Sequence, residues 1–216
     1  FWIPLATTEG ALVASINRGC SAIAKAGGAD VRIFQDFMTR APVFAAKSIP
    51  HAADSIRWIE EHFAEIKEAA EKTTSHGKLK KISTYTAGTS VYVRMAYETG
   101  DAMGMNMATL ASEAAAKVIE EATGLRLIAA SGNMCCDKKP AAINAVEGRG
   151  KTVSAGVFLS DELIRTVLKT EASLLIEVNT RKNLVGSARA GALGFNAHAA
   201  NVVAALFLAC GQDAAH

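Results

Sequence analysis

The spacing of hydrophobic residues predicts alternating helices and strands along most of the chain. Apolar positions recur every three or four residues over 12–23, which predicts a first helix. Thr7 or Thr8 can cap its start, and the glycines at 27–28 end it. A short apolar strand is expected next, over residues 31–37.

In the middle of the chain, the spacing of the apolar residues changes twice between a helical and a strand pattern. From residue 51 onward, apolar residues on one face predict an amphipathic helix of about five turns. Residues 82–86 and 91–97 read as a hairpin because apolar residues alternate around a short turn containing Gly88. A second helix should close at Gly124, before an apolar strand at 125–130.

This order of elements predicts the fold class. From residue 31 it is β-α-β-β-α-β, the split β-α-β or ferredoxin-like arrangement within an α+β protein. We expect a small nucleotide-binding domain at residues 42–129, inserted into a larger, mainly helical substrate-binding domain formed by 1–41 and 130–216. The sequence has no internal repeat and no low-complexity tract.

The last part of the chain predicts one more strand and a set of helices. A strand is expected at residues 153–159, and Ser160 can cap a short helix. Residues 170–181 are expected to be helical, with a tight glycine-containing connection at 183–194. An alanine-rich helix should then run from Asn196 to Cys210.

Composition and charge narrow the classes of function. Lys and Arg total 23 and Asp and Glu total 21, so a net charge of +2 gives no reason to expect nucleic acid as a partner. Four cysteines without a CxxC pair indicate neither a metal site nor a disulfide scaffold, and they fit a reducing cytoplasm. No apolar run is long enough to span a bilayer. The chain begins at Phe1 rather than Met, so we expect a fragment of a longer protein.

Residues 131–151 form the segment most suggestive of chemistry. Asp137, Lys138 and Lys139 stand directly before Pro140, and a residue that precedes proline favours extended or turn conformations. The two lysines are therefore expected on a loop. A lysine there can hold a carboxylate or an oxygen that gains negative charge, although a solvated surface loop is the alternative.

Other candidate sites carry weaker signals. Glu9 falls in the first turn of the first helix, where a carboxylate is also favoured by the helix dipole alone. Residues 100–106 open a helix with two glycines and could approach a phosphate, or could be an ordinary helix start. The run Arg149-Gly150-Lys151 could also contact phosphates. Three tyrosines of the hairpin, Tyr85, Tyr92 and Tyr97, leave open a non-catalytic ligand- or RNA-binding module.

Several long motifs share one resemblance. The segments are ATTEGALVAS at 6–15, MTRAPV at 38–43, TGDAMGMNM at 99–107, SGN at 131–133, DKKPAAIN at 137–144, NLVGSA at 183–188, NAHAAN at 196–201 and CGQDAA at 210–215. In the residues of these motifs, and in their order and spacing, the chain resembles 3-hydroxy-3-methylglutaryl-coenzyme A (HMG-CoA) reductase, of the class I, archaeal-like form. The resemblance runs nearly from end to end.

The resemblance implies an enzyme that reduces HMG-CoA to mevalonate and coenzyme A with two NADPH. It assigns Lys138 to the thioester oxygen, where a fixed positive charge would stabilise the developing oxyanion. It assigns Glu9 as the proton donor, whose pKa should be raised for that task. Asp213 would join Lys138 and Glu9 and keep the lysine charged. No metal is implied.

The resemblance also implies how the ligands are held and how subunits assemble. The implied substrate-binding residues are Arg40, Ser131, Asn133, Asp137, Lys139, Lys182 and Asn201. The implied cofactor-binding residues are Asp101, Met103, Gly104, Met105 and Asn106, with Ser75 and His76. Family members are dimers or tetramers with the active site between subunits, so a homo-oligomer is expected, without nucleic acid and without a membrane segment in this chain.

The sequence departs from the family pattern at two places. His76 stands where relatives carry an arginine for the 2′-phosphate of the cofactor, so NADH remains open beside NADPH. The family's second catalytic histidine lies downstream of CGQDAA and outside this sequence. His198 is expected to be structural, and the fragment alone is expected to have little activity.

Overall fold

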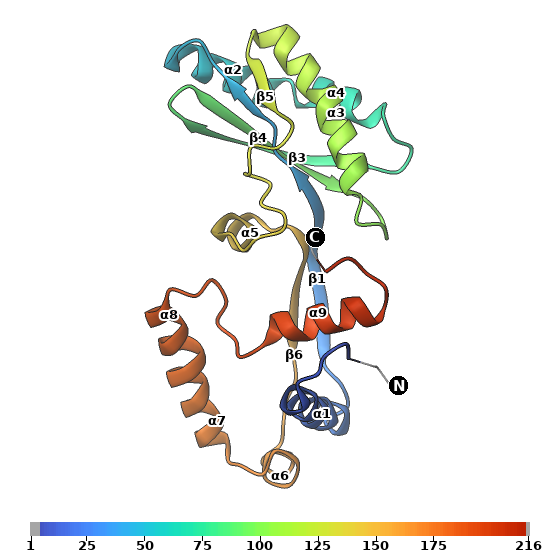
Figure 1. Cartoon of the computed structure of the whole chain (residues 1–216), viewed down its shortest axis with the longest axis vertical. Coiled ribbons are helices and arrows are strands. Elements are labelled where there is room, and N and C mark those ends of the chain that lie inside the picture. The colour runs from blue at the N-terminus through green and yellow to red at the C-terminus, as the bar shows by residue number, and fades with distance from the viewer. Residues whose placement is uncertain (1–4, 215–216) are drawn as a thin grey trace. The chain divides into compact units, whose positions relative to one another are not determined.

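The computed structural model describes residues 5–214, and the chain divides into two compact units (Figure 1). One unit is Ile33–Val153, and the other combines Phe1–Arg32 with Ser154–His216. We call them the central unit and the outer unit. The compact units are defined by contacts within the chain, whereas the limits expected at residues 42 and 129 concern nucleotide- and substrate-binding domains. Those limits stay a prediction.

An antiparallel sheet organises the central unit around strand β4. On one side β4 pairs with β3 along its whole length, and on the other it pairs first with β2 and then with β1. β5 pairs with the far side of β2. The strands are β1 (Asp30–Arg40), β2 (Val43–Ala45), β3 (Lys78–Ala87), β4 (Ser90–Glu98), β5 (Arg126–Ala129) and β6 (Gly150–Gly156), and β6 lies beside β1.

Local signals explain where the helices of the central unit begin and end. The Ser48 hydroxyl accepts a hydrogen bond from the amide of His51, and Pro50 occupies the first turn, where its missing N–H costs nothing. Gly104 and Gly124 flank the longest helix in left-handed conformations, with φ of 75° and 71°. The helices are α2 (Ile49–Glu61), α3 (Phe63–Glu71), α4 (Met105–Thr123) and α5 (Ala142–Glu147).

The strict alternation of β4 separates a core face from a polar face. Val91, Val93, Met95 and Tyr97 are fully buried in one cluster with the apolar sides of α2, α3 and α4. Arg94, between Val93 and Met95, points to the opposite face and bonds carbonyl groups of the segment after β5. The helices thus cover one face of the sheet, and residues 131–149 cover the other.

The outer unit is helical and buries few apolar side chains. Among its described residues only Leu12, Ala22, Ile164 and Ala205 are buried hydrophobics. Two stretches are π-helical, with hydrogen bonds from each residue to the fifth one along. Its helices are α1 (Gly10–Lys25), α6 (Asp161–Leu163), η1 (Ile164–Leu168), α7 (Ala172–Val178), η2 (Asn179–Gly186), α8 (Ser187–Ala190) and α9 (Ala199–Ala209).

The α+β class is confirmed in its coarse form, a mixture of helices and antiparallel sheet. The hairpin, the helix closed by Gly124 and the cap at Ser160 are confirmed. The five-turn helix instead breaks at His62, whose Nδ1 lies 2.8 Å from the Trp58 carbonyl oxygen. The last strand lies three residues earlier than expected, at Gly150–Gly156.

The connection expected at residues 183–194 was wrong for residues 183–190, which are helical. Helical structure continues from α7 through η2 and α8, and it ends at Gly191, where φ is 70°. Gly186 has ordinary helical angles, so a glycine alone did not mark the end of this helix. Within residues 5–214, no helix has the length and apolar character needed to cross a membrane.

Candidate functional site

The loop after β5 holds three residues in a conformation that side chains normally avoid. Asn133, Cys136 and Lys138 have φ of 63°, 43° and 61°. Left-handed angles at residues other than glycine cost energy and persist only where the surroundings enforce them, often at ligand sites. The predicted loop conformation of the lysine pair is confirmed, and α5, which follows it, was not foreseen.

Hydrogen bonds to the backbone hold this loop against the polar face of the sheet. Thr39 Oγ1 donates to the carbonyl of Cys135 at 3.2 Å, and Arg94 Nε donates to that of Met134 at 3.0 Å. Asn144 Nδ2 on α5 donates to the Cys136 carbonyl at 2.8 Å. The loop is therefore fixed on both sides by side chains of regular elements, which offsets the strain at its left-handed residues.

Gly132 allows the loop to approach the sheet closely. Its amide donates to the carbonyl of Ala41 at 2.7 Å. A Cβ at this position would lie 2.6 Å from Val43 Cβ and 2.9 Å from a ring carbon of Tyr92. No side chain larger than hydrogen fits without moving β2 or β4, so the entry of the loop is set by packing.

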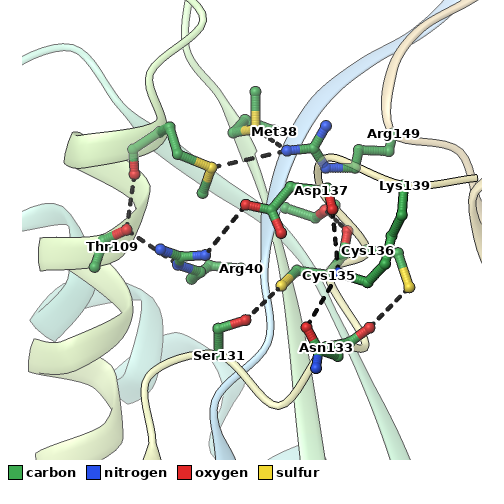
Figure 2. Close-up of polar contacts among 12 residues, drawn as sticks. Met38, Arg40, Thr109, Ser131, Asn133, Cys135, Cys136, Asp137, Lys139 and Arg149 are labelled. Carbon is green, nitrogen blue, oxygen red and sulfur yellow. Dashed lines mark hydrogen bonds and ion pairs between the residues drawn. The ribbon is translucent and has the colours of Figure 1, made fainter. Parts of the chain in front are cut away.

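Arg40 and Asp137 form the central ion pair of the site (Figure 2). Arg40 Nη1 lies 3.7 Å from Asp137 Oδ2, and both side chains are largely buried, with 17% and 14% exposed. Arg40 Nε also donates to Thr109 Oγ1 on α4 at 3.0 Å. A partly buried pair of this kind is screened by solvent less than a surface pair, and it fixes the directions of both side chains.

The two lysines of the loop lie in different surroundings. Lys139 Nζ donates to Asn133 Oδ1 at 3.2 Å and to the carbonyl of Asp137 at 3.3 Å. Lys138 is exposed, and within residues 5–214 its ammonium group makes no hydrogen bond or ion pair. Lys138 can therefore contact a ligand without first breaking a contact inside the chain.

Positive charge exceeds negative charge around Asp137. Arg94, Arg149 and Arg40 all reach this region, and Asp137 is the carboxylate that Arg40 pairs with. Burial lowers the pKa of Arg149, Asp137 opposes that shift, and the nearby Arg94 and Arg40 add to it. Such a cluster favours an anionic ligand, because a carboxylate would relieve the repulsion among the guanidinium groups.

Ser131 and Cys135 meet at the base of the loop. Ser131 Oγ lies 3.1 Å from Cys135 Sγ, and Cys135 is fully buried. Cys136, next along the chain, donates its thiol to the Asn133 carbonyl at 2.8 Å. Neither cysteine belongs to a metal-binding group, since residues 5–214 contain no cluster of three or more potential metal-ligand side chains.

A second set of predicted residues gathers where α4 begins. Gly104 opens the helix with φ of 75°, and a Cβ there would lie 2.5 Å from Thr99 Cγ2. A Cβ at Gly77 would clash with Met107 of the first turn of α4, so the exposed Ser75 and His76 lie near the helix start. Close backbone approach and unpaired helix amides are what a phosphate-bearing cofactor needs, so these residues fit one.

Four predicted site residues belong to the outer unit. Glu9 is the exposed residue before α1, and its amide donates to Thr7 Oγ1 at 3.2 Å. Lys182 is exposed in η2, Asn201 is exposed in α9, and Asp213 lies in the exposed segment after α9. The predicted residues of the central unit lie around the loop after β5 and at the start of α4, whereas these four lie in the outer unit.

Sequence reasoning missed two side chains that build the site, and it gave a third, Arg149, only as part of a run that could contact phosphates. Thr109 binds Arg40, Arg94 holds the loop, and Arg149 lies against the sulfur atoms of Met38 and Met105. A signal existed for Arg94, because an arginine inside a strictly alternating apolar strand must point away from the core. Thr109 had no such signal, since a threonine inside a helix is common.

Comparison with known proteins identifies one family. The family model described as hydroxymethylglutaryl-coenzyme A reductase matches residues 1–216. Enzymes named 3-hydroxy-3-methylglutaryl-coenzyme A reductase from Halobacterium salinarum and Haloferax volcanii are 56% and 58% identical over 215 and 214 residues. The matches cover 100% and 99% of this chain and 53% of each relative, so the chain spans about half the length of these curated relatives.

Solved structures support the fold. A 3-hydroxy-3-methylglutaryl-coenzyme A reductase of Streptococcus pneumoniae aligns with a TM-score of 0.71 at 20% identity, covering 98% of this chain and 55% of that one. The class II enzyme of the same species, bound to NADPH in open conformations, aligns with a TM-score of 0.63 at 19% identity, covering 87% of this chain and 48% of that one. At this level of identity the likeness concerns the fold.

Proposed function

Because the chain belongs to the hydroxymethylglutaryl-coenzyme A reductase family, we propose that the full-length gene product reduces HMG-CoA to mevalonate and coenzyme A. The observation that carries this proposal is the strained, anchored loop with Lys138 exposed beside the Arg40–Asp137 pair. It places a lysine that makes no hydrogen bond or ion pair within residues 5–214 directly after Asp137 in the chain, at a cluster suited to an anion. A substrate with a free carboxylate and a thioester requires both features.

The proposed reaction needs four electrons and two protons on the way from thioester to primary alcohol. Two molecules of NADPH, bound in turn, would each supply one hydride. Lys138 donates hydrogen bonds to the thioester oxygen and holds the negative charge that develops there. Its side chain is exposed and makes no hydrogen bond or ion pair within residues 5–214, which leaves all three donors available.

Of the two protons, Glu9 supplies the one for the oxygen in this proposal, and the departing coenzyme A thiolate would take the other from the family's histidine downstream of CGQDAA. The reduced oxygen must gain a proton, and a carboxylic acid beside Lys138 can give it. Asp213 would hydrogen-bond into the same group and favour the charged form of the lysine. This part of the proposal rests on the family motifs that contain these residues, ATTEG and CGQDAA.

The charged end of the substrate would be held by the central cluster. Arg40 and Lys139 contribute positive charge, and Ser131 and Asn133 contribute short polar side chains from the same loop. Asp137 orients Arg40 and can accept the hydroxyl hydrogen of the substrate. The family motifs add Lys182 and Asn201 from the outer unit to the same task.

The cofactor would bind at the start of α4. Gly104 and the exposed Asn106 and Asp101 offer backbone and side-chain donors and acceptors there, with Met103 and Met105 as apolar neighbours. The closeness of Gly77 to Met107 supports a role for Ser75 and His76 at the same place. We propose NADPH as the reductant, with NADH as the competitor that a histidine at position 76 would admit more readily than an arginine.

The finer features of fold and assembly belong to the same proposal. Antiparallel order β5-β2-β4-β3 with α2, α3 and α4 on one face supports a ferredoxin-like domain at residues 42–129. Exposed apolar side chains of the outer unit support a homodimer or homotetramer with the active site between subunits. Free thiols at all four cysteines fit a cytoplasmic location.

The alternative of an RNA-binding module finds little support. Base stacking would need exposed aromatic rings on the sheet, but Tyr97 is 1% exposed and lies under the helices. Tyr92 meets the loop at Gly132. Neither ring is presented to a nucleic acid, and the net charge of +2 supplies no broad basic surface.

The test of the proposed function is a spectrophotometric assay on the full-length gene product. We expect HMG-CoA to cause oxidation of NADPH, followed at its nicotinamide absorbance, with two NADPH consumed per mevalonate formed. NADH run in parallel measures the cofactor preference. Failure of both nicotinamides to be oxidised, with folded protein present, would contradict the proposal.

A further inference from the structure

Thr109 occupies a position that joins two functional elements. Its hydroxyl accepts a hydrogen bond from Arg40 Nε at 3.0 Å and donates one to the Met105 carbonyl at 2.9 Å. Met105 is the first residue of α4, directly after Gly104. One hydroxyl group therefore contacts both a proposed substrate residue and the first turn of the proposed cofactor helix (Figure 2).

Arg149 makes a second connection between the same elements. Its Nη2 lies 3.3 Å from Met38 Sδ on β1 and 3.7 Å from Met105 Sδ on α4. Burial lowers the pKa of the Arg149 guanidinium, and the negative charge of Asp137 raises it. Arg149 thus packs between the strand that carries Arg40 and the helix that follows the cofactor segment.

We infer that Thr109 and Arg149 are positioning residues that hold the start of α4 to the substrate cluster, so that binding of substrate and binding of cofactor favour each other. This inference rests on the proposed function, because it uses the proposed sites at Arg40 and at Gly104. Neither residue needs to touch a ligand. Thr109 acts through the direction of Arg40, and Arg149 acts through the packing of Met105.

The two sites would be coupled because Arg40 can be oriented in only a few ways. Its guanidinium has several donors, of which Nε is directed to Thr109 and Nη1 to Asp137. Because Thr109 on α4 holds Nε, the two terminal nitrogens of the Arg40 guanidinium keep a fixed orientation toward the substrate loop. A shift of the α4 start on binding cofactor would move Thr109, and Arg40 with it, which couples the two sites.

The experiment replaces Thr109 with valine and with serine in the full-length gene product. Valine keeps the shape and removes the hydroxyl, whereas serine keeps the hydroxyl. Thr123 provides a matched control, because its hydroxyl donates to the Ile119 carbonyl at 2.6 Å at the other end of the same helix. Steady-state kinetics with HMG-CoA and NADPH, and the dissociation constant of NADP⁺ with and without HMG-CoA, are measured for each variant.

We expect Thr109→Val to raise the KM for HMG-CoA about tenfold, as loss of one hydrogen bond to a charged group implies. The improvement in NADP⁺ binding that HMG-CoA causes should shrink toward onefold in this variant. Thr109→Ser should keep both properties near wild type, and Thr123→Val should leave both unchanged even if it lowers the melting temperature. Arg149→Met should weaken the same coupling, and Arg149→Lys should restore part of it.

The outcomes separate this inference from the proposed function. Wild-type turnover tests the function itself, and the ratios between variants test the positioning role. The inference is overturned if Thr109→Val binds and couples both ligands like wild type. It is also overturned if Thr109→Ser is as impaired as Thr109→Val, or if Thr123→Val changes KM equally, because shape or helix stability would then explain the effect.

Discussion

The two units of this chain differ in how far they bury their apolar side chains. In the central unit, residues from β1, β2, β4 and three helices form one closed cluster, with Phe44, Ile59 and Ile66 fully buried. In the outer unit, Phe158 and Leu208 are 86% and 59% exposed. The central unit thus buries a continuous core, whereas the described part of the outer unit buries only four apolar side chains and leaves others exposed.

The difference also separates the proposed roles. The central unit holds its functional loop through backbone hydrogen bonds from Thr39, Arg94 and Asn144, so its geometry is determined locally. The outer unit carries Glu9 and Asp213 on exposed segments at the ends of helices. We expect the first set to be preorganised and the second to become ordered for catalysis only within the assembled enzyme.

The largest expected effect comes from separating the units. A protein comprising residues 30–156, which keeps β1 and β6 whole, should unfold cooperatively, because its hydrophobic cluster is complete. Residues 1–29 joined by a flexible linker to 157–216 should not. Circular dichroism during heating and the dispersion of amide NMR signals distinguish the two. A cooperative transition in the second protein would break the comparison.

Replacing the exposed lysine of the loop should have the next largest effect. We expect Lys138→Ala to lower kcat of the full-length gene product about 10²- to 10³-fold, because an oxyanion loses its fixed donor. The melting temperature should stay within experimental error, since the side chain is exposed and makes no hydrogen bond or ion pair in residues 5–214. Lys117→Ala, an exposed lysine on α4, is the matched control and should leave kcat unchanged.

The sequence predicted the central unit far better than the outer one, and the reason is physical. Alternation in β4 and the glycine end of α4 at Gly124 are local signals that the closed core also favours. In the outer unit Gly186 lies within helical structure, where a tight connection over residues 183–194 was expected. Where a surface is completed by other parts of a protein, local pattern and final structure need not agree.

The candidate site was only partly accessible from the sequence. Asp137, Lys138 and Lys139 could be placed on a loop because Pro140 restricts the residue before it. The contact of Arg40 with Thr109 joins positions 69 residues apart, so no local pattern could reveal it. The left-handed angles of Asn133, Cys136 and Lys138 also depend on tertiary hydrogen bonds rather than on residue type.

Paired truncations would sharpen the comparison of the two surfaces. Ile66→Ala should reduce the free energy of unfolding by about 2 to 5 kcal/mol, because it opens a cavity at a fully buried position. Leu208→Ala should change it by less than about 0.5 kcal/mol in this chain, since the side chain is largely exposed. Urea unfolding of both variants measures the two changes, and similar losses would contradict the assignment of Leu208 to an uncovered surface.

A smaller effect than that of Ile66→Ala is expected at Tyr97, the tyrosine enclosed in the central core. Tyr97 Oη lies 3.0 Å from Ser112 Oγ and 3.2 Å from Met95 Sδ, and burial raises the pKa of the phenol well above its usual range. Tyr97→Phe should therefore cost about 1 kcal/mol at neutral pH, the usual net value of one hydrogen bond.

The pH dependence of that cost gives a sharper test. Because the folded pKa of Tyr97 is raised, the contribution of the neutral phenol is complete below the unfolded pKa of about 10 and is lost as pH rises further. The cost of Tyr97→Phe should accordingly be constant from pH 7 to 9 and diminish above pH 10. Urea unfolding of both proteins across this range measures it. A cost that stays constant to pH 11 would show that Tyr97 is reached by solvent, and that the central core is less closed than its fully buried neighbours indicate.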